Sequence, residues 1–289
     1  MIEFVKMHGC GNDYLFIDCL NKEPPEDPHS LSRQMSDRHL GVGADGLVLL
    51  LPSALDQAHC RMRIFNADGS EAQMCGNAIR CLAKLVYERG WIVEERMAVE
   101  TPAGIIGLEL YVRNRKVCSV RADMGAPRLA AHEIPIRLEL ERVLEHPLPL
   151  SGGREFNITC VSMGNPHTVI FPDESVESFA VHDFGPAIEN HPLFPERTNV
   201  EFINVRGPNL LRQRTWERGS GETLACGTGA SASAVAAILT GRCEPGKVDI
   251  DLNGGRLAID WRQHENVFMT GPAEEVFTGC WPYDSGNYG

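Results

Sequence analysis

The sequence predicts an α+β fold of two pseudo-symmetric lobes that arose by internal duplication. Each lobe is expected to be a curved, mostly antiparallel sheet around a central helix. Three observations lead to this prediction: a pattern shared by the two halves, many short strand-like runs in each half, and one apolar helix-like segment in each half. A pattern that recurs along a chain indicates repeated structural units, and many strands with few helices indicate an α+β architecture.

The shared pattern is clearest around two cysteines that lie 151 positions apart. The stretches RIFNADGSEAQMCGNAIR (63–80) and RTWERGSGETLACGTGAS (214–231) align without a gap. The matched pairs are Arg63 with Arg214, Phe65 with Trp216, Glu71 with Glu222, Cys75 with Cys226, Gly76 with Gly227, Gly90 with Gly241 and Gly104 with Gly255. Each Cys-Gly opens an apolar segment that stops at a glycine, which is a common helix C-terminal signal. The sequence therefore predicts two helices of equal length.

The remaining elements follow in the same order in each half. The N-terminal MIEFVKMHGCGNDYLFID (1–18) predicts a strand, a turn and a strand, and its Gly-Asn matches that of MGNPHTVIF (163–171). Strand-like runs follow each helix: MAVET and GIIGLELYV in the first half, VDIDL and GRLAIDW in the second. Asn-Gly-Gly at 253–255 is a favourable hairpin turn. We expect surface loops at NKEPPEDPHS (21–30) and RVLEHPLPLSGGRE (142–155) from their Pro, Gly and charge content.

These elements place the boundary between the lobes after the strand-like RKVCSVRAD. The N-terminal lobe, with Cys75, is expected to span residues 1–121 and to be completed by the tail, 273–289. The C-terminal lobe, with Cys226, is expected to span residues 122–272.

Composition narrows the class of protein. The chain has 289 residues and a formal net charge of −12, which argues against a nucleic-acid binder, because such proteins need a basic face. The N-terminus lacks the features of a signal peptide, and no window is apolar for long enough to span a membrane. We therefore expect a cytoplasmic protein. The ten cysteines form no CxxC pair and no zinc-finger spacing, so we expect reduced thiols and no metal site.

Cys75 and Cys226 are predicted to stand at the N-termini of the two helices. The partial positive charge there favours the thiolate form of a cysteine, and the free N–H groups of the first turn can bind a carboxylate. Two such thiols, presented from two facing lobes, would suit inversion of a stereocentre beside a carboxylate. One thiolate would remove the α-proton and one thiol would deliver a proton to the other face. The alternative is that both cysteines only fill space, as buried free cysteines usually do, and we retain that interpretation for the other eight cysteines, including Cys10, Cys19, Cys81 and Cys160.

Four motifs in the same order resemble the diaminopimelate epimerase family, whose members are cofactor-independent amino-acid epimerases of lysine and peptidoglycan precursor biosynthesis. The motifs are FNADGSEAQMCGN, MGNPH, RTNVEF and WERGSGETLACGTGA, and the resemblance runs from KMHGCGNDYLFID to MTGP. It implies the diaminopimelate epimerase-like fold, Cys75 and Cys226 as the catalytic bases, no cofactor, LL-2,6-diaminopimelate as substrate and a homodimer. His167 and Glu217 would influence the protonation of the thiols. The implied substrate-binding residues are Asn12, Asn66, Gly76, Asn77, Asn165, Asn199, Glu217, Arg218, Gly227 and Thr228.

Some of these residues have simpler interpretations from the sequence alone. Asn66 precedes Asp-Gly and would shape a turn, His167 would be an ordinary strand-edge histidine, and Glu217 would pair with Arg218 on a surface. Two positions depart from the family pattern. Gly46 ends GVGADG where some members have a substrate-contacting Gln, so we leave it out of the site, and Ala78 replaces a frequent Gly in the first helix.

Three other functions remain as alternatives. A proline or hydroxyproline racemase would use the same two thiols, although such enzymes typically have His at the position of Asn77 and lack the FNADGSE and ERGSGET motifs. A thiol redox protein would join Cys75 and Cys226 in a reversible disulfide. A binding module would tolerate serine at both positions.

Overall fold

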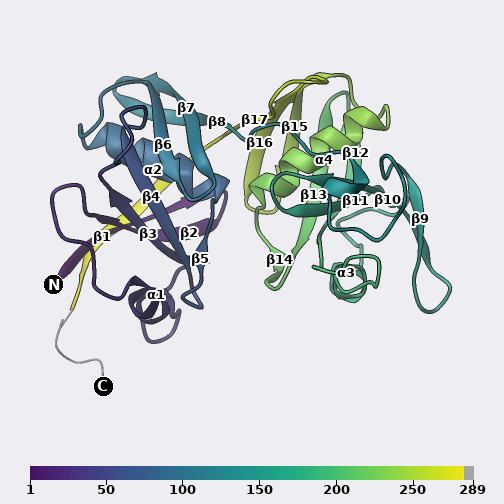
Figure 1. Cartoon of the computed structure of the whole chain (residues 1–289), viewed down its shortest axis with the longest axis horizontal. Coiled ribbons are helices and arrows are strands. Elements are labelled where there is room, and N and C mark those ends of the chain that lie inside the picture. Colours follow the sequence, from purple (N-terminus) through teal and green to yellow (C-terminus); the bar gives the residue numbers. More distant parts are fainter. Residues whose placement is uncertain (283–289) are drawn as a thin grey trace. The chain divides into compact units, whose positions relative to one another are not determined.

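The structure, a computed structural model, describes residues 1–282 and divides the chain into two compact units (Figure 1). Unit 1 contains residues 1–122 together with the segment from Gly271 onward, and unit 2 contains Asp123–Thr270. Residues 283–289, which the sequence assignment placed in the N-terminal lobe, lie outside the described residues. No helix within residues 1–282 has the length and apolar character needed to cross a membrane.

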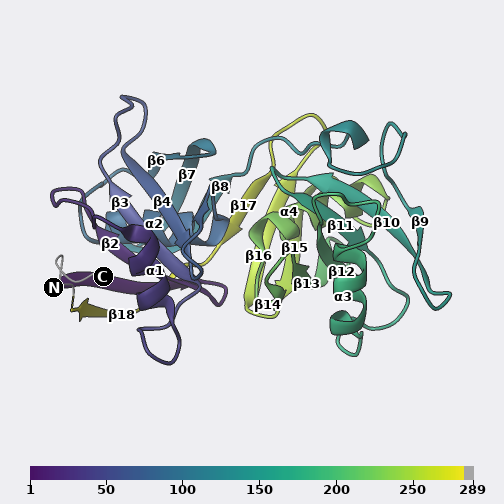
Figure 2. The same cartoon turned by 60° about the horizontal axis from the view of Figure 1, so that its bottom comes forward.

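Unit 1 is a strongly curved sheet with two helices. Its elements are β1 (Ile2–Gly9), β2 (Asn12–Asp18), α1 (Pro28–Ser36), β3 (Gly46–Leu51), β4 (Cys60–Asn66), β5 (Glu71–Ala72), α2 (Gly76–Glu88), β6 (Arg96–Thr101), β7 (Gly104–Arg113), β8 (Lys116–Asp123) and β18 (Glu274–Trp281). The hydrogen-bonded order is β18-β1-β2-β3-β4-β6-β7-β8. Only the β2–β3 and β4–β6 pairs are parallel. The C-terminal strand β18 lies beside the N-terminal β1, as Figure 2 shows.

Unit 2 repeats this arrangement. Its elements are the 3₁₀ turn Ala131–Glu133, β9 (His146–Pro149), β10 (Glu155–Ser162), β11 (Pro166–Ile170), α3 (Val181–Glu189), β12 (Asn199–Gly207), β13 (Leu210–Glu217), β14 (Gly221–Thr223), α4 (Gly227–Leu239), β15 (Gly246–Leu252), β16 (Gly255–Trp261) and β17 (Phe268–Gly271). The order is β9-β10-β11-β12-β13-β15-β16-β17, again with two parallel pairs.

Strand register confirms the duplication residue by residue. In unit 1 the parallel β4–β6 pair sets Cys60 opposite Val99, and in unit 2 the β13–β15 pair sets Leu211 opposite Ile250. These two pairs are related by the same separation of 151 that relates the cysteines. The predicted α+β class and the pseudo-symmetric, mostly antiparallel lobes are therefore confirmed.

Each sheet buries both faces, because one helix covers each side. In unit 1, Leu15, Ile17, Leu47 and Leu49 join the core cluster that includes Leu31 of α1. Side chains alternate across a strand, so the intervening residues of β2 and β3 point to the other face, where α2 packs. In unit 2 the same alternation gives one face to the α3 cluster and the other to α4. Figure 1 shows α2 and α4 each among the strands of its own unit.

Among the elements that the sequence analysis did not assign, three show why. The stretches expected to be loops contain the start of α1 and the whole of β9. Helix α1 is capped by Asp27, whose side chain accepts from the Ser30 N–H, so a capping signal was present inside the Pro-rich segment. Strand β9 consists of HPLP, a pattern that local propensity disfavours, and its pairing with β10 stabilises it. Helix α3 includes Pro186 and was likewise not predicted.

Candidate active site

Cys75 and Cys226 are the N-cap residues of α2 and α4. Both have extended backbone angles, with φ −140° and ψ 119° at Cys75 and φ −118° and ψ 112° at Cys226. Both helices contain 13 residues, as the glycine stops predicted. The first N–H groups of a helix lack partners within it and carry partial positive charge. Each thiol therefore lies beside a set of donors that suits an anion.

A short hairpin brings the chain to each cysteine, and a matched ion pair holds each hairpin. Arg63 pairs with Glu71 across β4 and β5, and Arg214 pairs with Glu222 across β13 and β14, both at 2.7 Å. The two pairs are the ones matched by the sequence repeat. In unit 2, Arg214 also donates to the carbonyls of Val176 and Phe179, at 2.8 and 2.9 Å.

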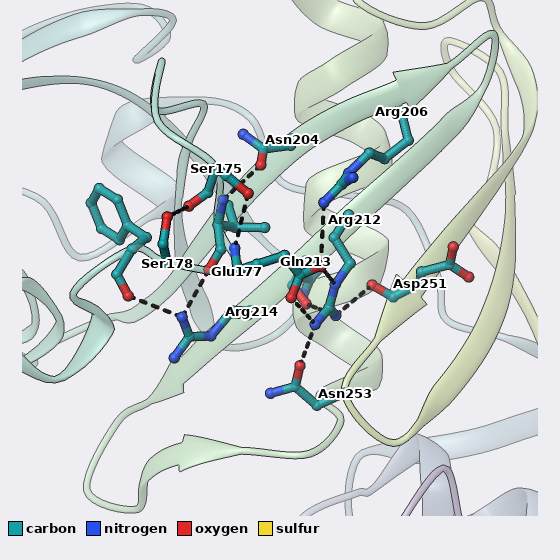
Figure 3. Close-up of polar contacts among 12 residues, drawn as sticks. Ser175, Glu177, Ser178, Asn204, Arg206, Arg212, Gln213, Arg214, Asp251 and Asn253 are labelled. Carbon is teal, nitrogen blue, oxygen red and sulfur yellow. Dashed lines mark hydrogen bonds and ion pairs between the residues drawn. The ribbon is translucent and has the colours of Figure 1, made fainter.

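A wider polar cluster surrounds this arginine in unit 2 (Figure 3). Arg212 Nε lies 2.8 Å from Glu177 Oε1, and Arg212 Nη2 donates to Asn253 Oδ1 at 2.6 Å. Arg206 reaches the same Glu177 carboxylate at 3.2 Å. The cluster joins the segment before α3 to β12, β13 and the turn after β15, and so helps to fix the strands that lead to Cys226.

In unit 1 the half-buried Cys75 thiol lies in a polar pocket. Tyr14 Oη donates to its Sγ at 3.5 Å, and the thiol donates to Asn12 Oδ1, also at 3.5 Å. Asn77 Nδ2 donates to the same Asn12 oxygen at 3.1 Å, and Asn12 Nδ2 donates to Asp45 Oδ2 at 2.7 Å. Burial, and then the neighbouring Cys75, raise the pKa of Tyr14 well above its ordinary value, so it remains a donor. Two predicted substrate residues, Asn12 and Asn77, thus contact the thiol or its partner directly.

A fully buried guanidinium supports this side of the site. Arg80, on α2, donates to Gly76 O at 2.9 Å, to Asn77 Oδ1 at 2.9 Å and to Pro272 O at 3.3 Å. Burial lowers the pKa of Arg80, while the nearby thiols of Cys10, Cys81 and Cys75 act to raise it. The positive charge in turn favours the thiolate of Cys75.

In unit 2 the Cys226 thiol is buried and accepts from the helix that it caps. The Gly229 N–H donates to Cys226 Sγ at 3.3 Å, and Thr228 Oγ1 lies 3.5 Å from the same sulfur. Asn165 Nδ2 donates to Thr228 Oγ1 at 3.3 Å. Asn165, Thr228 and Cys226, all predicted site residues, therefore form one hydrogen-bonded group.

The group continues into a buried pair. His167 Nε2 lies 3.1 Å from Asn165 Oδ1, and His167 Nδ1 lies 2.8 Å from Glu201 Oε1. Neither side chain of this pair is exposed to solvent. The interpretation of His167 as a strand-edge residue is wrong, because β11 is paired on both sides, with β10 and with β12.

Glu217 is the second carboxyl group beside Cys226. Its Oε1 accepts from Thr223 Oγ1 at 2.6 Å. Burial raises the pKa of Glu217, against hydrogen bonds from Thr223 and Cys226 and the nearby His167. Burial also raises the pKa of Cys226 well above its ordinary value, and the Glu217 and Glu201 carboxylates add to that shift. Glu217 therefore contacts the Cys226 thiol. The simpler interpretation from the sequence alone had placed it on the surface, paired with Arg218.

Six of the other eight cysteines are buried: Cys10, Cys19, Cys60, Cys81, Cys160 and Cys243. Burial raises the pKa of Cys81 and of Cys160 to about 12. Cys81 lies within α2 and Cys160 within β10, so neither stands at a helix N-terminus as Cys75 and Cys226 do. The packing interpretation therefore holds for the buried thiols, but it is wrong for Cys118 and Cys280, which are exposed.

Two predicted substrate residues lie further along the unit 2 strands. Asn199 Oδ1 accepts from the Arg218 N–H at 2.9 Å, and Asn199 Nδ2 donates to Pro166 O at 3.0 Å. Arg218 Nη1 donates to Glu196 O at 2.9 Å. Arg218 also lines a cavity of about 330 Å³ together with Arg128, and the cavity is of a size that suits a small ligand.

The unit 1 residue Asn66 holds a turn. Its N–H donates to Ser70 O at 2.8 Å and its Nδ2 donates to Ser70 Oγ at 3.0 Å. Gly46, left out of the site, has a packing reason to be glycine, because an added Cβ would lie 2.3 Å from Phe65 O. Among residues 1–282, no three His, Cys, Asp or Glu side chains lie close enough together to bind a metal ion.

Four residues in the surroundings of Cys75 and Cys226 were not predicted from the sequence: Tyr14, Asp45, Arg80 and Glu201. Tyr14 had a signal, because it matches His167 at the separation that aligns the two Gly-Asn motifs. Glu201 lies inside the quoted motif RTNVEF, but its burial follows only from the pairing of β11 with β12. Arg80 stands on a helix whose burial on all sides local sequence does not reveal.

Comparison with solved structures identifies the fold. A hydroxyproline epimerase from Agrobacterium vitis aligns with a TM-score of 0.68 at 17% identity, over 96% of this chain and 91% of that chain. A probable proline racemase from Agrobacterium radiobacter K84 aligns with a TM-score of 0.71 at 16% identity, over 99% and 94%. At such identities the likeness shows a shared fold, the one found in these racemases and epimerases.

Sequence comparison identifies the family. The family model for diaminopimelate epimerase matches residues 4–130 and 159–276. A diaminopimelate epimerase of Pelotomaculum thermopropionicum is 53% identical over 98% of this chain and 99% of its own length. One from Methanococcus maripaludis strain C6 is 47% identical over 96% and 99%. The chain belongs to the diaminopimelate epimerase family and is an isomerase.

Proposed function

We propose that this protein epimerises LL-2,6-diaminopimelate to meso-diaminopimelate without a cofactor, by an acid–base mechanism that uses Cys75 and Cys226. The observation that carries the proposal is the matched placement of the two thiols as N-cap residues of α2 and α4. Such a pair provides one base and one acid for a reaction that needs both. Family membership supports the substrate.

In the proposed reaction one cysteine, as thiolate, removes the proton from an α-carbon. The C–H electron pair stays on the carbon and delocalises into the adjacent carboxylate. The other cysteine, as thiol, delivers its proton to the opposite face of the carbanion. The first cysteine is then a thiol and the second a thiolate, so the reverse reaction uses the same groups in exchanged roles.

Helix donors would bind the reacting carboxylate. The first-turn N–H groups at Gly76 and Asn77 in unit 1 and at Gly227 and Thr228 in unit 2 lie beside the thiols. Positive partial charge at these termini stabilises the negative charge that accumulates on the carboxylate as the proton leaves. The buried, hydrogen-bonded surroundings strengthen this effect, because the local dielectric constant is lower than that of water.

The distal amino-acid group of the substrate needs polar ligands of its own. Arg218 can bind the distal carboxylate with two parallel hydrogen bonds, and Asn66 and Asn199 offer both donors and acceptors. The cavity lined by Arg128 and Arg218 supports this assignment. His167 and Glu217 would adjust the protonation of Cys226. The roles in lysine and peptidoglycan precursor synthesis, the cytoplasmic location and the homodimer belong to the same proposal and are supported by family membership alone.

The decisive experiment is α-proton exchange followed by NMR. Reduced protein without added cofactor is incubated in heavy water with LL-diaminopimelate, and separately with proline and with hydroxyproline. We expect loss of the α-hydrogen signal and appearance of the meso isomer only with diaminopimelate. Exchange with proline or hydroxyproline instead would keep the two thiols and reject the substrate. Absence of exchange with all three would favour a redox or binding role.

A further inference from the structure

The proposed reaction gives His167 a role but leaves its buried partner, Glu201, without one. Glu201 on β12 and His167 on β11 lie on neighbouring parallel strands and are both fully inaccessible to solvent. They point to the face that α4 covers, because Glu201 Oε1 would lie 2.6 Å from a Cβ added at Gly229. The second carboxylate oxygen, Oε2, is buried and has no hydrogen-bond partner among the described residues. A buried carboxyl group in this condition is costly to keep and calls for an explanation.

We propose that Glu201 is a positioning residue for the Cys226 thiol. It holds the His167 ring so that a chain of hydrogen-bond donors, through Asn165 and Thr228, ends at Cys226 Sγ. The inference rests on the proposed function, because it gives Glu201 a role in that reaction without contact to a reacting atom.

The direction of the chain follows from the partners. Asn165 donates from Nδ2 to Thr228, so its Oδ1 faces His167 and can only accept. His167 must therefore carry a proton on Nε2 and donate to Asn165. Since Thr228 Oγ1 accepts from Asn165, its own hydrogen is available for Cys226 Sγ, 3.5 Å away. Each link thus directs its donor toward the sulfur.

Glu201 acts through orientation, because the buried pair has no net charge. With a proton on His167 Nε2, one further proton lies between His167 Nδ1 and Glu201 Oε1, at 2.8 Å. The pair is then either imidazolium with carboxylate or imidazole with carboxylic acid, and both forms are neutral overall. Replacement of Glu201 by a neutral residue beside a neutral imidazole leaves this charge unchanged.

Unit 1 shows that the fold does not require a buried carboxyl group at the position of Glu201. At the separation that matches the two Gly-Asn motifs, Tyr14 corresponds to His167 and Val48 to Glu201. The helix position of Gly229 corresponds to Ala78. In unit 1 the tyrosine donates directly to Cys75, with no buried carboxyl at the Val48 position. The glutamate and the glycine that makes room for it therefore occur together in unit 2, where the thiol is reached through intermediates.

The donors matter because other groups oppose ionisation of Cys226. Burial raises the pKa of Cys226, the carboxylate of Glu217 raises it further, and the hydrogen bonds from Thr228 and Gly229 lower it. A charge on Glu201 also acts to raise this pKa, but the proton that Glu201 shares with His167 offsets that charge. His167 is the other titratable group of the hydrogen-bonded chain that runs from Glu201 to Cys226. Loss of the Thr228 donor should therefore make the Cys226 thiolate harder to form, whereas Cys75 should be unaffected.

The test compares Glu201→Val with Glu201→Gln in the full-length protein. Iodoacetamide alkylation is followed between pH 6 and pH 10, and peptide mass mapping gives the rates at Cys226 and Cys75 from the same sample. We expect Glu201→Val to raise the apparent pKa of Cys226 alkylation by about one unit, roughly tenfold slower alkylation at neutral pH. Glu201→Gln can still donate to His167 Nδ1 and should keep the profile within about twofold of wild type.

Thr228→Val provides a second variant that does not depend on a change in the buried pair. It should reproduce the slower alkylation of Cys226, and Glu201→Val should add little in that background, because both changes remove the same donor. Three outcomes would overturn the proposal: an unchanged Cys226 profile in Glu201→Val or Thr228→Val, equal slowing at Cys75, or full additivity of the two changes. Equal slowing of Cys226 alkylation in Glu201→Gln and Glu201→Val would also reject the proposal, because a donor to His167 Nδ1 would then make no difference. Alkylation needs no substrate, so these results stand even if the protein does not epimerise diaminopimelate.

Discussion

In unit 1 the helix that begins after Cys75 buries the guanidinium of Arg80, whereas in unit 2 the corresponding residue is Ser231. Both side chains donate to the matching helix carbonyl, Arg80 to Gly76 O at 2.9 Å and Ser231 to Gly227 O at 3.0 Å. The backbone role has therefore been kept, while the buried cation occurs only in unit 1. In unit 2 the buried ionisable group against the helix is instead Glu201.

In the proposed mechanism, this difference would give the two copies of one fold opposite tasks. The strands, the N-cap position and the helix length agree between the units. The neighbouring charges differ: a cation near Cys75 favours the thiolate, and carboxylates near Cys226 favour the thiol. An epimerase that exchanges one proton between two thiols needs one of each at every moment. The free protein should therefore hold its proton mainly on Cys226.

The largest effect should come from removal of either thiol. Cys75→Ala and Cys226→Ala should each lower the rate of epimerisation by at least about a hundredfold, because general acid–base groups contribute roughly 10²–10⁴. Turnover is followed by the appearance of meso-diaminopimelate, and thermal unfolding should remain cooperative in both variants. Near-normal turnover in a folded variant would reject the two-base mechanism.

Removal of the buried cation should be the next largest effect. Arg80→Met leaves Gly76 O and Asn77 Oδ1 without their donors, and we expect a loss of about 3 kcal/mol in the free energy of unfolding. Alkylation of Cys75 should slow because the thiolate loses a nearby positive charge, and Arg80→Lys should recover part of that rate. Ser231→Ala, the matched change in unit 2, should cost about 1 kcal/mol and leave alkylation of Cys75 unchanged. Equal effects on Cys75 from both sites would contradict the asymmetry.

The sequence predicts the two helices that begin after the cysteines, but it does not predict all the residues that surround the thiols. Cys75 and Cys226 were found because a repeat, a glycine after each cysteine and a glycine stop all mark the same helix, and each is a local signal. Strand β9 was missed because it has little strand propensity of its own and depends on pairing with β10. Arg80 and Glu201 were missed for a related reason, because their burial depends on which strands and helices pack together. From the sequence alone, a charged residue is expected to be exposed to solvent.

The third residue of each helix, Ala78 in α2 and Gly229 in α4, allows a matched comparison of steric effects. Gly229→Ala would place a Cβ 2.6 Å from Glu201 Oε1 and 3.2 Å from Cys226 Sγ. We expect a loss of about 1–3 kcal/mol in the free energy of unfolding from overpacking, with slower alkylation of Cys226. Ala78→Gly makes the reverse change in unit 1 and should cost about 1 kcal/mol through helix propensity, with the Cys75 rate kept. Denaturant unfolding measures both values, and a neutral Gly229→Ala would show that Glu201 can move away freely.

The smallest effect should separate the two matched ion pairs before the cysteines. Side chains of the Arg214–Glu222 pair are 15% and 13% exposed, against 28% and 30% for Arg63–Glu71. Because solvent screens the more exposed pair, Glu222→Gln should cost about 1–2 kcal/mol and Glu71→Gln less than about 1 kcal/mol.

The pH dependence of the same two variants tests the cause. The hydrogen bond from Arg63 lowers the pKa of Glu71, and at Glu222 the Arg214 guanidinium lowers the pKa despite opposing burial. A carboxyl group whose pKa is lowered in the folded state contributes stability above its unfolded value, and that contribution is lost as the pH falls through the folded value. The difference between wild type and each variant should therefore shrink as the pH falls below the ordinary glutamate value of 4.5. A difference that stays constant from pH 7 to pH 3 would mean that packing of the side chain, and not its charge, fixes the hairpins that lead to the two thiols.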